Sequence, residues 1–299
     1  MTESYISFPK LGIVFNADNV AFSIGAKDIY WYGIIIAVGF VVAIIAGLKL
    51  AKKYGVSSET IYDIVIFGTP SAIICARLYY VIFEWEYYAT NPIDIIKIWN
   101  GGIAIYGAII GAVIPTVIYC KIKRCNLPLV CDIGAVGLVI GQIFGRWGNF
   151  FNQEAFGTNT ENIFGMTGNV IKRELAQMAA RGMDVVPDIP VHPTFLYESA
   201  WNVLVLLVLL FLFRHRKFDG QNFLTYISLY GLGRFFIEGL RTDSLYIGNF
   251  RVSQIVAAVT FLAGALTIVY ILKEKKLRVT KPIVNIYNEN DSKNLSESE

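Results

Sequence analysis

The chain has 299 residues, of which 55% are hydrophobic and only 16% are charged, and its formal net charge is +3. An average soluble domain carries about 25% charged residues, so this composition excludes an ordinary soluble protein and indicates a polytopic membrane protein. Three windows without a charged residue, at 29–48, 101–120 and 252–272, are each long enough to cross a hydrocarbon core of about 30 Å.

Residues 1–28 precede the first long apolar run. They lack a basic start followed by an apolar core, so they do not resemble a cleavable signal peptide. We expect them to form an extracytoplasmic N-terminal arm.

The apolar runs predict an all-α membrane protein, a polytopic bundle of seven transmembrane helices within residues 29–272. The expected spans are 29–50, 61–83, 101–120, 131–151, 195–213, 222–240 and 252–272. Basic residues cluster after every odd-numbered span, and these clusters contain Lys49, Lys52, Lys53, Lys121, Lys123, Arg124, Arg214, Arg216, Lys217, Lys273, Lys275, Lys276 and Arg278. Because cytoplasmic loops are enriched in lysine and arginine, the pattern predicts an N-terminus outside and a C-terminus in the cytoplasm.

Two polar segments lie outside the expected spans. The insertion 152–194, between the fourth and fifth spans, is expected to form a small extracytoplasmic cap. Residues 273–299 begin with a basic cluster and are polar after Lys281, which predicts a disordered cytoplasmic tail.

The sequence gives no sign of a metal site. The four cysteines form no C-x-x-C pair, and there are only two histidines, so we expect the cysteines to be reduced packing residues. They are Cys75, Cys120, Cys125 and Cys131.

Glycines recur at a spacing of four in two expected spans. One pair is Gly107 and Gly111, and a second series is Gly137, Gly141 and Gly145. Small residues at this spacing let helices approach closely, so we expect these faces to serve helix packing.

Polar residues gather near the outer ends of the expected spans. They are Tyr32, Arg77, Tyr106, Arg146, Asn149, Glu154, His192, Glu198, Arg234, Glu238 and Arg241. The inner halves contain little of this kind beyond Asp63 and Asp132. Since ionisable groups at membrane depth are costly and usually functional, the distribution predicts one polar cavity that opens to the outer leaflet.

The arginines suggest what this cavity binds. Tyr230, Arg234, Glu238 and Arg241 share one face of a helix by spacing. Taken alone, Arg234 and Glu238 form a pair that lowers the cost of burying both. With Arg146 there are three arginines, more than this glutamate needs, and a guanidinium group binds phosphate oxygens bidentately. A lipid phosphate is the expected ligand.

Two other classes of function fit part of the pattern. A transporter or flippase for a lipid or an anionic solute would also use an outward-facing arginine cavity. The inner halves lack a second polar site and no inverted repeat is visible, which argues against it. A purely structural scaffold does not explain so many buried charges.

The segment 145–157 resembles the signature of the bacterial prolipoprotein diacylglyceryl transferase family, G-R-x-G-N-F-x-N-x-E-x-x-G. Every fixed position is present, in Gly145, Arg146, Gly148, Asn149, Phe150, Asn152, Glu154 and Gly157. Segments 31–33, 101–107, 192–198 and 230–241 are similar to further motifs of the family, and the resemblance covers roughly residues 5–272.

The resemblance implies an enzyme of the bacterial cytoplasmic membrane whose active site faces the outer leaflet. Such an enzyme transfers the diacylglyceryl group of phosphatidylglycerol to the lipobox cysteine of a prolipoprotein, forms a thioether and releases glycerol phosphate. This is the first step of lipoprotein maturation. The implied partners are phosphatidylglycerol, the prolipoprotein signal peptide with its lipobox cysteine and membrane lipid, with no nucleic acid and no cofactor.

The resemblance also implies functional positions. Catalytic roles are expected for Arg146, Arg234, Glu154, Tyr106 and Glu238. Substrate-binding roles are expected for Arg146, Asn149, Asn152, Tyr32, Tyr230, Gly157, His192, Glu198, Arg77 and Arg241.

One position departs from the family. Tyr106 stands where many members have a histidine that has been considered a candidate base. We therefore expect the segment from Arg146 to Glu154 to carry more of the mechanism here, with Glu154 and Glu238 both open as acceptors of the thiol proton.

Overall fold

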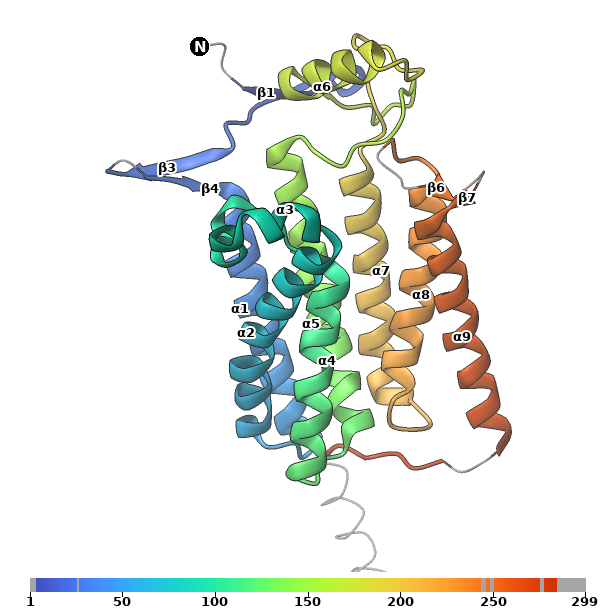
Figure 1. The fold of residues 1–299 in the computed structure, drawn as a ribbon. Helices are drawn as coiled ribbons and strands as arrows, with labels where there is room; N and C mark the ends of the chain where they lie inside the picture. Colours follow the sequence, from blue (N-terminus) through green and yellow to red (C-terminus); the bar gives the residue numbers. More distant parts are fainter. Residues whose placement is uncertain (1–3, 26, 243–245, 248–249, 275–276, 284–299) are drawn as a thin grey trace, which may run out of the picture. The chain divides into compact units, whose positions relative to one another are not determined.

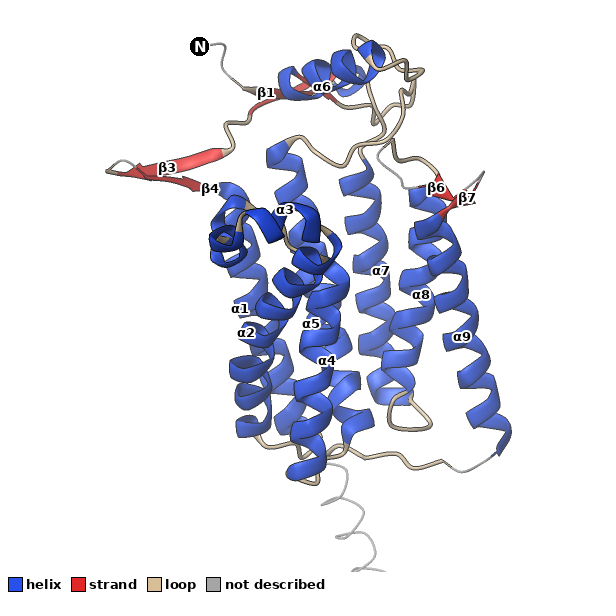
Figure 2. Cartoon of the chain, in the orientation of Figure 1, coloured by secondary structure: helices blue, strands red, loops and turns tan. Residues whose placement is uncertain are grey.

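A computed structural model describes residues 4–25, 27–242, 246–247, 250–274 and 277–283. The protein is mostly helical, as Figures 1 and 2 show. It divides into two compact units, the first formed by Met1–Ala46 and Gly134–Val279 and the second by Gly47–Ile133 and Thr280–Glu299. Most of the tail expected to be disordered, 284–299, lies outside the described residues.

Each of the seven expected ranges contains a long helix. These are α1 (Trp31–Lys53), α2 (Ser58–Phe83), α4 (Ile105–Ile122), α5 (Leu127–Asn152), α7 (Thr194–His215), α8 (Gln221–Glu238) and α9 (Val252–Glu274). Among the described residues, six helices are long and apolar enough to cross a membrane, and α8 is not one of them. The expectation of a polytopic, mostly helical membrane protein is thus confirmed, whereas a seventh crossing is not.

The second unit is built around α2 and α4, which pack against each other. A Cβ atom on Gly111 would lie 2.7 Å from Cβ of Cys75, and one on Gly107 would meet the backbone of α2. The expected close approach is confirmed for this pair of glycines. In the first unit it is wrong for Gly141, because nothing among the described residues lies within 4 Å of an added Cβ atom there.

The connection between α2 and α4 contains short helices that the sequence did not indicate. They are α3 (Trp85–Thr90), η2 (Pro92–Ile96) and η3 (Ile98–Asn100). The expected third span therefore starts too early, since α4 begins only at Ile105. All four cysteines are free thiols.

The first unit carries strands as well as helices. They are β1 (Tyr5–Phe8), β2 (Ile13–Asn16), β3 (Val20–Ile24), β4 (Lys27–Tyr30), β5 (Thr167–Gly168), β6 (Tyr246–Ile247) and β7 (Phe250–Arg251). The expectation of an all-α protein overlooked these strands, although they are short and lie outside the long helices (Figure 2).

Strand β1 joins the N-terminal arm to the 152–194 insertion. It pairs antiparallel with β2 and with β5, so that Ile6 faces both Phe15 and Gly168 in register. The amphipathic helix α6 (Asn169–Ala180) follows β5 and buries Ile171 and Leu175 completely. These two side chains share one apolar core with Ile6. The arm and the insertion therefore fold as one body, a cap above the end of α5.

Candidate functional site

The signature segment begins in the last turns of α5 and leaves the helix through a sharp turn. The amide of Gln153 donates to the carbonyl of Phe150 (3.0 Å), and the amide of Glu154 donates to that of Asn149 (3.1 Å). This is the Schellman pattern of a helix end, in which the residue after the cap adopts a left-handed conformation, usually as glycine. Here that residue is Gln153, with φ 53°, and Ala155 is also left-handed, with φ 56°.

The side chain of Gln153 explains why the turn tolerates a residue other than glycine. It is 1% exposed. Its Nε2 donates to Oγ of Ser4 (3.0 Å), and its Oε1 accepts from the amide of Val170 (3.2 Å). Unfavourable backbone angles persist where the surroundings over-determine them, and they cluster at functional sites. Gln153 thus anchors the turn to both halves of the cap.

The carboxylate of Glu198 on α7 is the centre of an ionic cluster. Its side chain is 3% exposed. Nη2 of Arg146 on α5 lies 2.6 Å from Oε2, and Nη1 of Arg234 on α8 lies 2.9 Å from Oε1. Arg241, just beyond α8, approaches Oε1 at 3.7 Å. One buried carboxylate therefore gathers the three arginines that the sequence predicted to share a site.

A second buried carboxylate, that of Glu238, completes the cluster. Nη2 of Arg234 donates to its Oε2, and Arg251 donates to its backbone carbonyl. Arg146, Arg234, Arg241 and Arg251 thus all contact Glu198 or Glu238. Burying charges this way is costly unless they are paired, and guanidinium groups are suited to bind phosphate oxygens.

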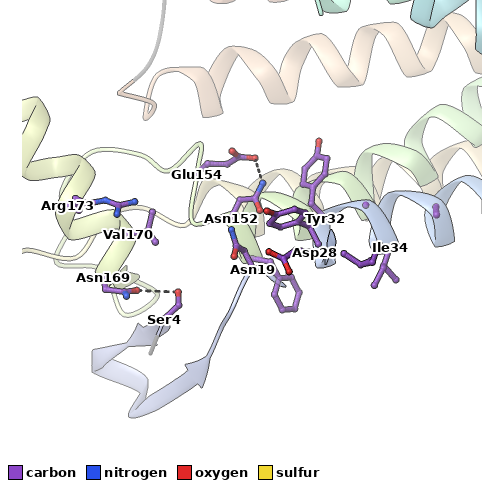
Figure 3. A pocket seen from close by; sticks show the side chains of 15 residues that line it. Ser4, Asn19, Asp28, Tyr32, Ile34, Asn152, Glu154, Asn169, Val170 and Arg173 are labelled. Atoms are coloured by element: carbon purple, nitrogen blue, oxygen red, sulfur yellow. Dashed lines mark hydrogen bonds between the residues drawn. The ribbon is translucent and has the colours of Figure 1, made fainter. Parts of the chain in front are cut away.

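Neutral amides connect this cluster to Glu154. Nη1 of Arg146 donates to Oδ1 of Asn149 (3.3 Å), whose Nδ2 in turn donates to Oε1 of Glu154 (2.8 Å). Nδ2 of Asn152 donates to the same oxygen (3.3 Å), as Figure 3 shows. Glu154 is exposed, and these contacts are with amides rather than cations. Its carboxylate is therefore available for chemistry in a way that Glu198 and Glu238 are not.

Gly157 ties the signature segment to two other segments. Its amide donates to the carbonyl of His192 (2.9 Å), and it forms a β-bridge with Arg241. A Cβ atom at this position would lie 2.8 Å from Cβ of His192 and 2.8 Å from the carbonyl oxygen of Leu240. Only glycine fits so close an approach. Burial lowers the pKa of His192, whose Nδ1 lies 3.3 Å from the hydroxyl of Tyr197.

Two tyrosines lie on the helices around the cluster. Tyr32, at the start of α1, packs its ring against Gly148, where an added Cβ atom would meet the ring directly. Tyr230 lies one helical turn before Arg234 on α8 and stacks on Tyr226, with ring centroids 5.8 Å apart. Tyr230 thus lies near Arg234 along α8, and Tyr32 contacts α5, the helix that carries Arg146.

Arg77 and Tyr106 belong to the second unit and are described within it. The guanidinium group of Arg77 donates to the carbonyls of Asp94, Ile95 (2.8 Å), Gly101 (2.6 Å) and Gly102 (2.7 Å). Four of its five N–H groups thus hold the connection that leads into α4. Tyr106, the second residue of α4, is 50% exposed and its ring lies 6.2 Å from that of Tyr79.

The structure adds functional detail that sequence reasoning missed. Gln153 and Arg251 were given no role, because a glutamine between an asparagine and a glutamate and an arginine near a span end carry no distinctive local signal. Glu198 was expected to contact substrate, and the ion pairs give it the further task of orienting arginines. Within the described part of the chain, no group of three His, Cys, Asp or Glu side chains could hold a metal ion.

The fold and the cluster define a polytopic membrane protein whose helices bring arginines and buried glutamates together beside a cap of strands and a helix. The sequence matches the model of the prolipoprotein diacylglyceryl transferase family over residues 19–270. It is 46% identical over 250 residues to the phosphatidylglycerol–prolipoprotein diacylglyceryl transferase of Finegoldia magna, an alignment that covers 83% of this chain and 94% of the relative. The chain belongs to the prolipoprotein diacylglyceryl transferase family.

Two other relatives carry the same name. The protein of Listeria innocua is 46% identical over 253 residues, which cover 85% of this chain and 89% of the relative. That of Clostridioides difficile is 39% identical over 264 residues, which cover 88% of this chain and 99% of the relative.

Proposed function

We infer that this chain is a phosphatidylglycerol–prolipoprotein diacylglyceryl transferase. The observation that carries this conclusion is the cluster in which Arg146, Arg234 and Arg241 converge on two buried carboxylates. The phosphodiester of phosphatidylglycerol carries one negative charge, and guanidinium groups such as those of Arg146 and Arg234 bind phosphate oxygens bidentately. The names of relatives 39–46% identical to this chain support the same substrates.

The reaction moves a diacylglyceryl group from phosphate oxygen to cysteine sulfur. A bond forms between the sulfur of the lipobox cysteine and the glyceryl carbon, while the bond from that carbon to the phosphate oxygen breaks. Glycerol phosphate leaves with the bonding electrons, and the thiol proton passes to a base. An ordinary thiol has a pKa of about 8.5, so removing this proton and stabilising the departing phosphate are the two tasks for the site.

Arg146 and Arg234 are suited to hold the phosphate. Each guanidinium group has five N–H groups, and its bonds to described residues use two of them. The shared carboxylate of Glu198 fixes both groups, so their remaining donors are oriented before the lipid arrives. Preorganised donors stabilise developing charge without a cost of reorganisation during the reaction.

Of the remaining side chains, some are proposed to bind the lipid and one is proposed to accept the proton of the thiol. Asn149 and Asn152 are proposed to bind the glycerol headgroup, and Glu154 is proposed to accept the thiol proton. Glu154 suits this task better than Glu238 because it is exposed and its hydrogen-bond donors are neutral amides, whereas Glu238 is buried against Arg234. A role for the hydroxyl of Tyr106 in the reaction, implied by the family resemblance, stays a prediction.

Other expected substrate contacts take supporting roles in this proposal. Tyr32 and Tyr230 would line the path of the lipid, and Gly157 would hold His192 and Arg241 together. Arg77 would act through the connection whose carbonyls it binds.

The orientation in the bacterial cytoplasmic membrane is proposed from the charges at the helix ends. Basic residues occupy the last turns of α1, α4, α7 and α9. If α8 is the remaining crossing, the positive-inside rule places these ends in the cytoplasm and the ionic cluster at the outer leaflet. Alkaline phosphatase fused after Lys217 is expected to be inactive and the same reporter fused after Thr242 active. Equal activity of both fusions would contradict a crossing by α8.

A transfer assay tests the proposed function. The purified protein is mixed with phosphatidylglycerol labelled in the glycerol carbons of its diacylglyceryl group and with a synthetic lipobox peptide. We expect the label to appear on the peptide cysteine as a thioether that resists alkaline hydrolysis. Movement of the labelled lipid across the bilayer without any transfer would instead favour the flippase alternative.

A further inference from the structure

A cavity of about 1040 Å³ lies in the first unit, and Glu154 lines it. Arg146, which is linked to Glu154 through Asn149, is not among the lining residues. Its walls come from the N-terminal arm, the start of α1, the end of α5 and the start of α6. Figure 3 shows Asn19, Asp28 and Tyr32 on one side and Asn169 and Arg173 toward the cap. Tyr32, Asn152 and Glu154 of this lining also belong to the proposed site for lipid and thiol, and the residues of the arm and of α6 do not.

The charge of the lining disfavours a phosphate. Asp28 and Glu154 face it with Arg173 as the one basic residue among the lining side chains, which leaves a formal charge of −1. The neighbouring ionic cluster contains Arg146, Arg234 and Arg241. An anionic lipid headgroup would therefore prefer the arginines, and the cavity is left for a neutral or cationic ligand.

The polar groups of the lining match a polypeptide backbone. Asn19 and Asn169 line the cavity, outside the residues proposed to bind the lipid. A side-chain amide both donates and accepts hydrogen bonds, so it can pair with the N–H and C=O groups of an extended peptide. The lining also contains Ile34 and Val170, which would accommodate small apolar side chains. Mostly apolar walls with a few placed polar groups are typical of ligand pockets.

We propose that this cavity binds the polypeptide substrate around its reacting cysteine, with Glu154 as the boundary between the peptide and lipid sites. This inference rests on the proposed function and extends it by giving the second substrate a location. Glu154 lines the cavity and is joined to Arg146 through Asn149. A thiol at this boundary would lie next to both the carboxylate and the arginine-bound phosphate.

Kinetics on the full-length protein in phosphatidylglycerol nanodiscs test the proposal. In the Val170→Trp variant the indole fills part of the cavity, and we expect the KM for a lipobox peptide to rise about tenfold with an unchanged KM for phosphatidylglycerol. Ala176→Trp is the matched control, because Ala176 is an exposed residue of the same helix that does not line the cavity. A rise only in the KM for the lipid would overturn the proposal.

A photochemical experiment provides a readout that does not need turnover or a bulky buried residue. A benzophenone amino acid replaces Arg173 in one variant and Ala176 in another, both at exposed positions of α6. The probe is a fluorescent lipobox peptide whose cysteine is replaced by alanine. We expect cross-linking from position 173 and none from 176. Equal labelling at the two positions, or labelling at 173 by a photoreactive phosphatidylglycerol but not by the peptide, would contradict the proposal.

The experiments distinguish a failure of the proposed peptide site from a failure of the proposed transferase function. If wild-type protein transfers lipid to the reactive peptide but position 173 does not cross-link, only the peptide site is wrong. If the peptide cross-links at 173 and no lipid is transferred, the cavity is a peptide site and the transferase assignment is wrong.

Discussion

Glu198 and Arg146 form an ion pair of 2.6 Å between α7 and α5, and the carboxylate involved is almost completely buried. The same carboxylate binds Arg234 of α8 at 2.9 Å. The two proposed phosphate-binding residues are therefore held at a fixed separation by a third side chain rather than by direct contact. Preorganisation of the anion site depends on that third side chain.

Replacing Glu198 by glutamine tests this arrangement. The variant keeps the shape of the side chain but removes its charge, and both arginines lose their common ionic partner. We expect kcat to fall about 100-fold, since a misplacement of about 1 Å can cost this much. The KM for phosphatidylglycerol should not rise, because the cluster becomes more positive. An increase in this KM with unchanged kcat would show that Glu198 binds substrate instead.

Replacing Arg146 or Arg234 by lysine keeps the charge but removes the planar fork. We expect each variant to lose about 100-fold in transfer rate, comparable to the loss of one donor to a developing oxyanion. The initial rate with labelled phosphatidylglycerol measures this. Arg181→Lys is the control, since Arg181 is exposed at the end of α6. Near-normal rates in the Arg146 and Arg234 variants would rule out bidentate binding.

Replacing Tyr106 by phenylalanine removes only a hydroxyl group and retains the ring that lies near Tyr79. A hydrogen bond to a charged group contributes about 1.5–3 kcal/mol, so we expect kcat to fall roughly tenfold or more. Tyr79→Phe is the matched control on the neighbouring ring. Full activity of the Tyr106 variant would remove this residue from the chemistry.

Gln153 provides a prediction about stability. Gln153→Ala keeps the left-handed strain and loses the bonds to Ser4 and Val170, at a cost of about 1–3 kcal/mol. Gln153→Gly loses the same bonds but relieves the strain, which is about 1–2 kcal/mol for a side chain in this conformation. The melting temperature should fall in the order wild type, glycine variant, alanine variant. A glycine variant less stable than the alanine variant would contradict this account of the turn.

The lowered pKa of His192 predicts a pH dependence of stability. Burial disfavours the imidazolium form in the folded protein, whereas an unfolded histidine takes up a proton near its ordinary pKa of about 6.5. The unfolded state then binds more protons, so the contribution of His192 is fully present above that value and is lost as the pH falls through the folded pKa. The melting temperature of His192→Gln should decline less than that of the wild type between about pH 7 and pH 5. Parallel curves would show that His192 does not titrate differently in the two states.

Much of the helical framework could be predicted from the sequence, because each long apolar run specifies a helix by itself. The cap could not be predicted in the same way. Strand β1 finds its partner β5 about 160 residues further along the chain, and such pairing leaves no local pattern. Gln153 was missed for a related reason. A left-handed residue at a helix end is usually recognised in a sequence because it is a glycine, and here it is a glutamine.

The candidate site, too, could be predicted from the sequence only in part. Its members were recognisable, because charged groups at the ends of apolar runs are rare and because the signature is specific. The pair of Arg234 and Glu238 was recognisable from their spacing on one helix. The pairing of Glu198 with Arg146 was not, since these two residues meet only through tertiary packing. Arg77 illustrates the same limit, because its use of four backbone carbonyls depends on a loop geometry that no spacing encodes.

The unusual polarity of α8 has a consequence for how the protein is made. A helix that carries Arg234 and Glu238 is a poor candidate for insertion on its own, since a central arginine costs about 2.5–3.5 kcal/mol on insertion scales. Glu198, which pairs with Arg234, lies on the preceding helix α7, and α7 is apolar enough to enter the membrane first. On the proposed seven-span topology, we expect α8 to enter the bilayer as half of a hairpin with α7. The order of synthesis would then ensure that the carboxylate is already in place when the arginine leaves water.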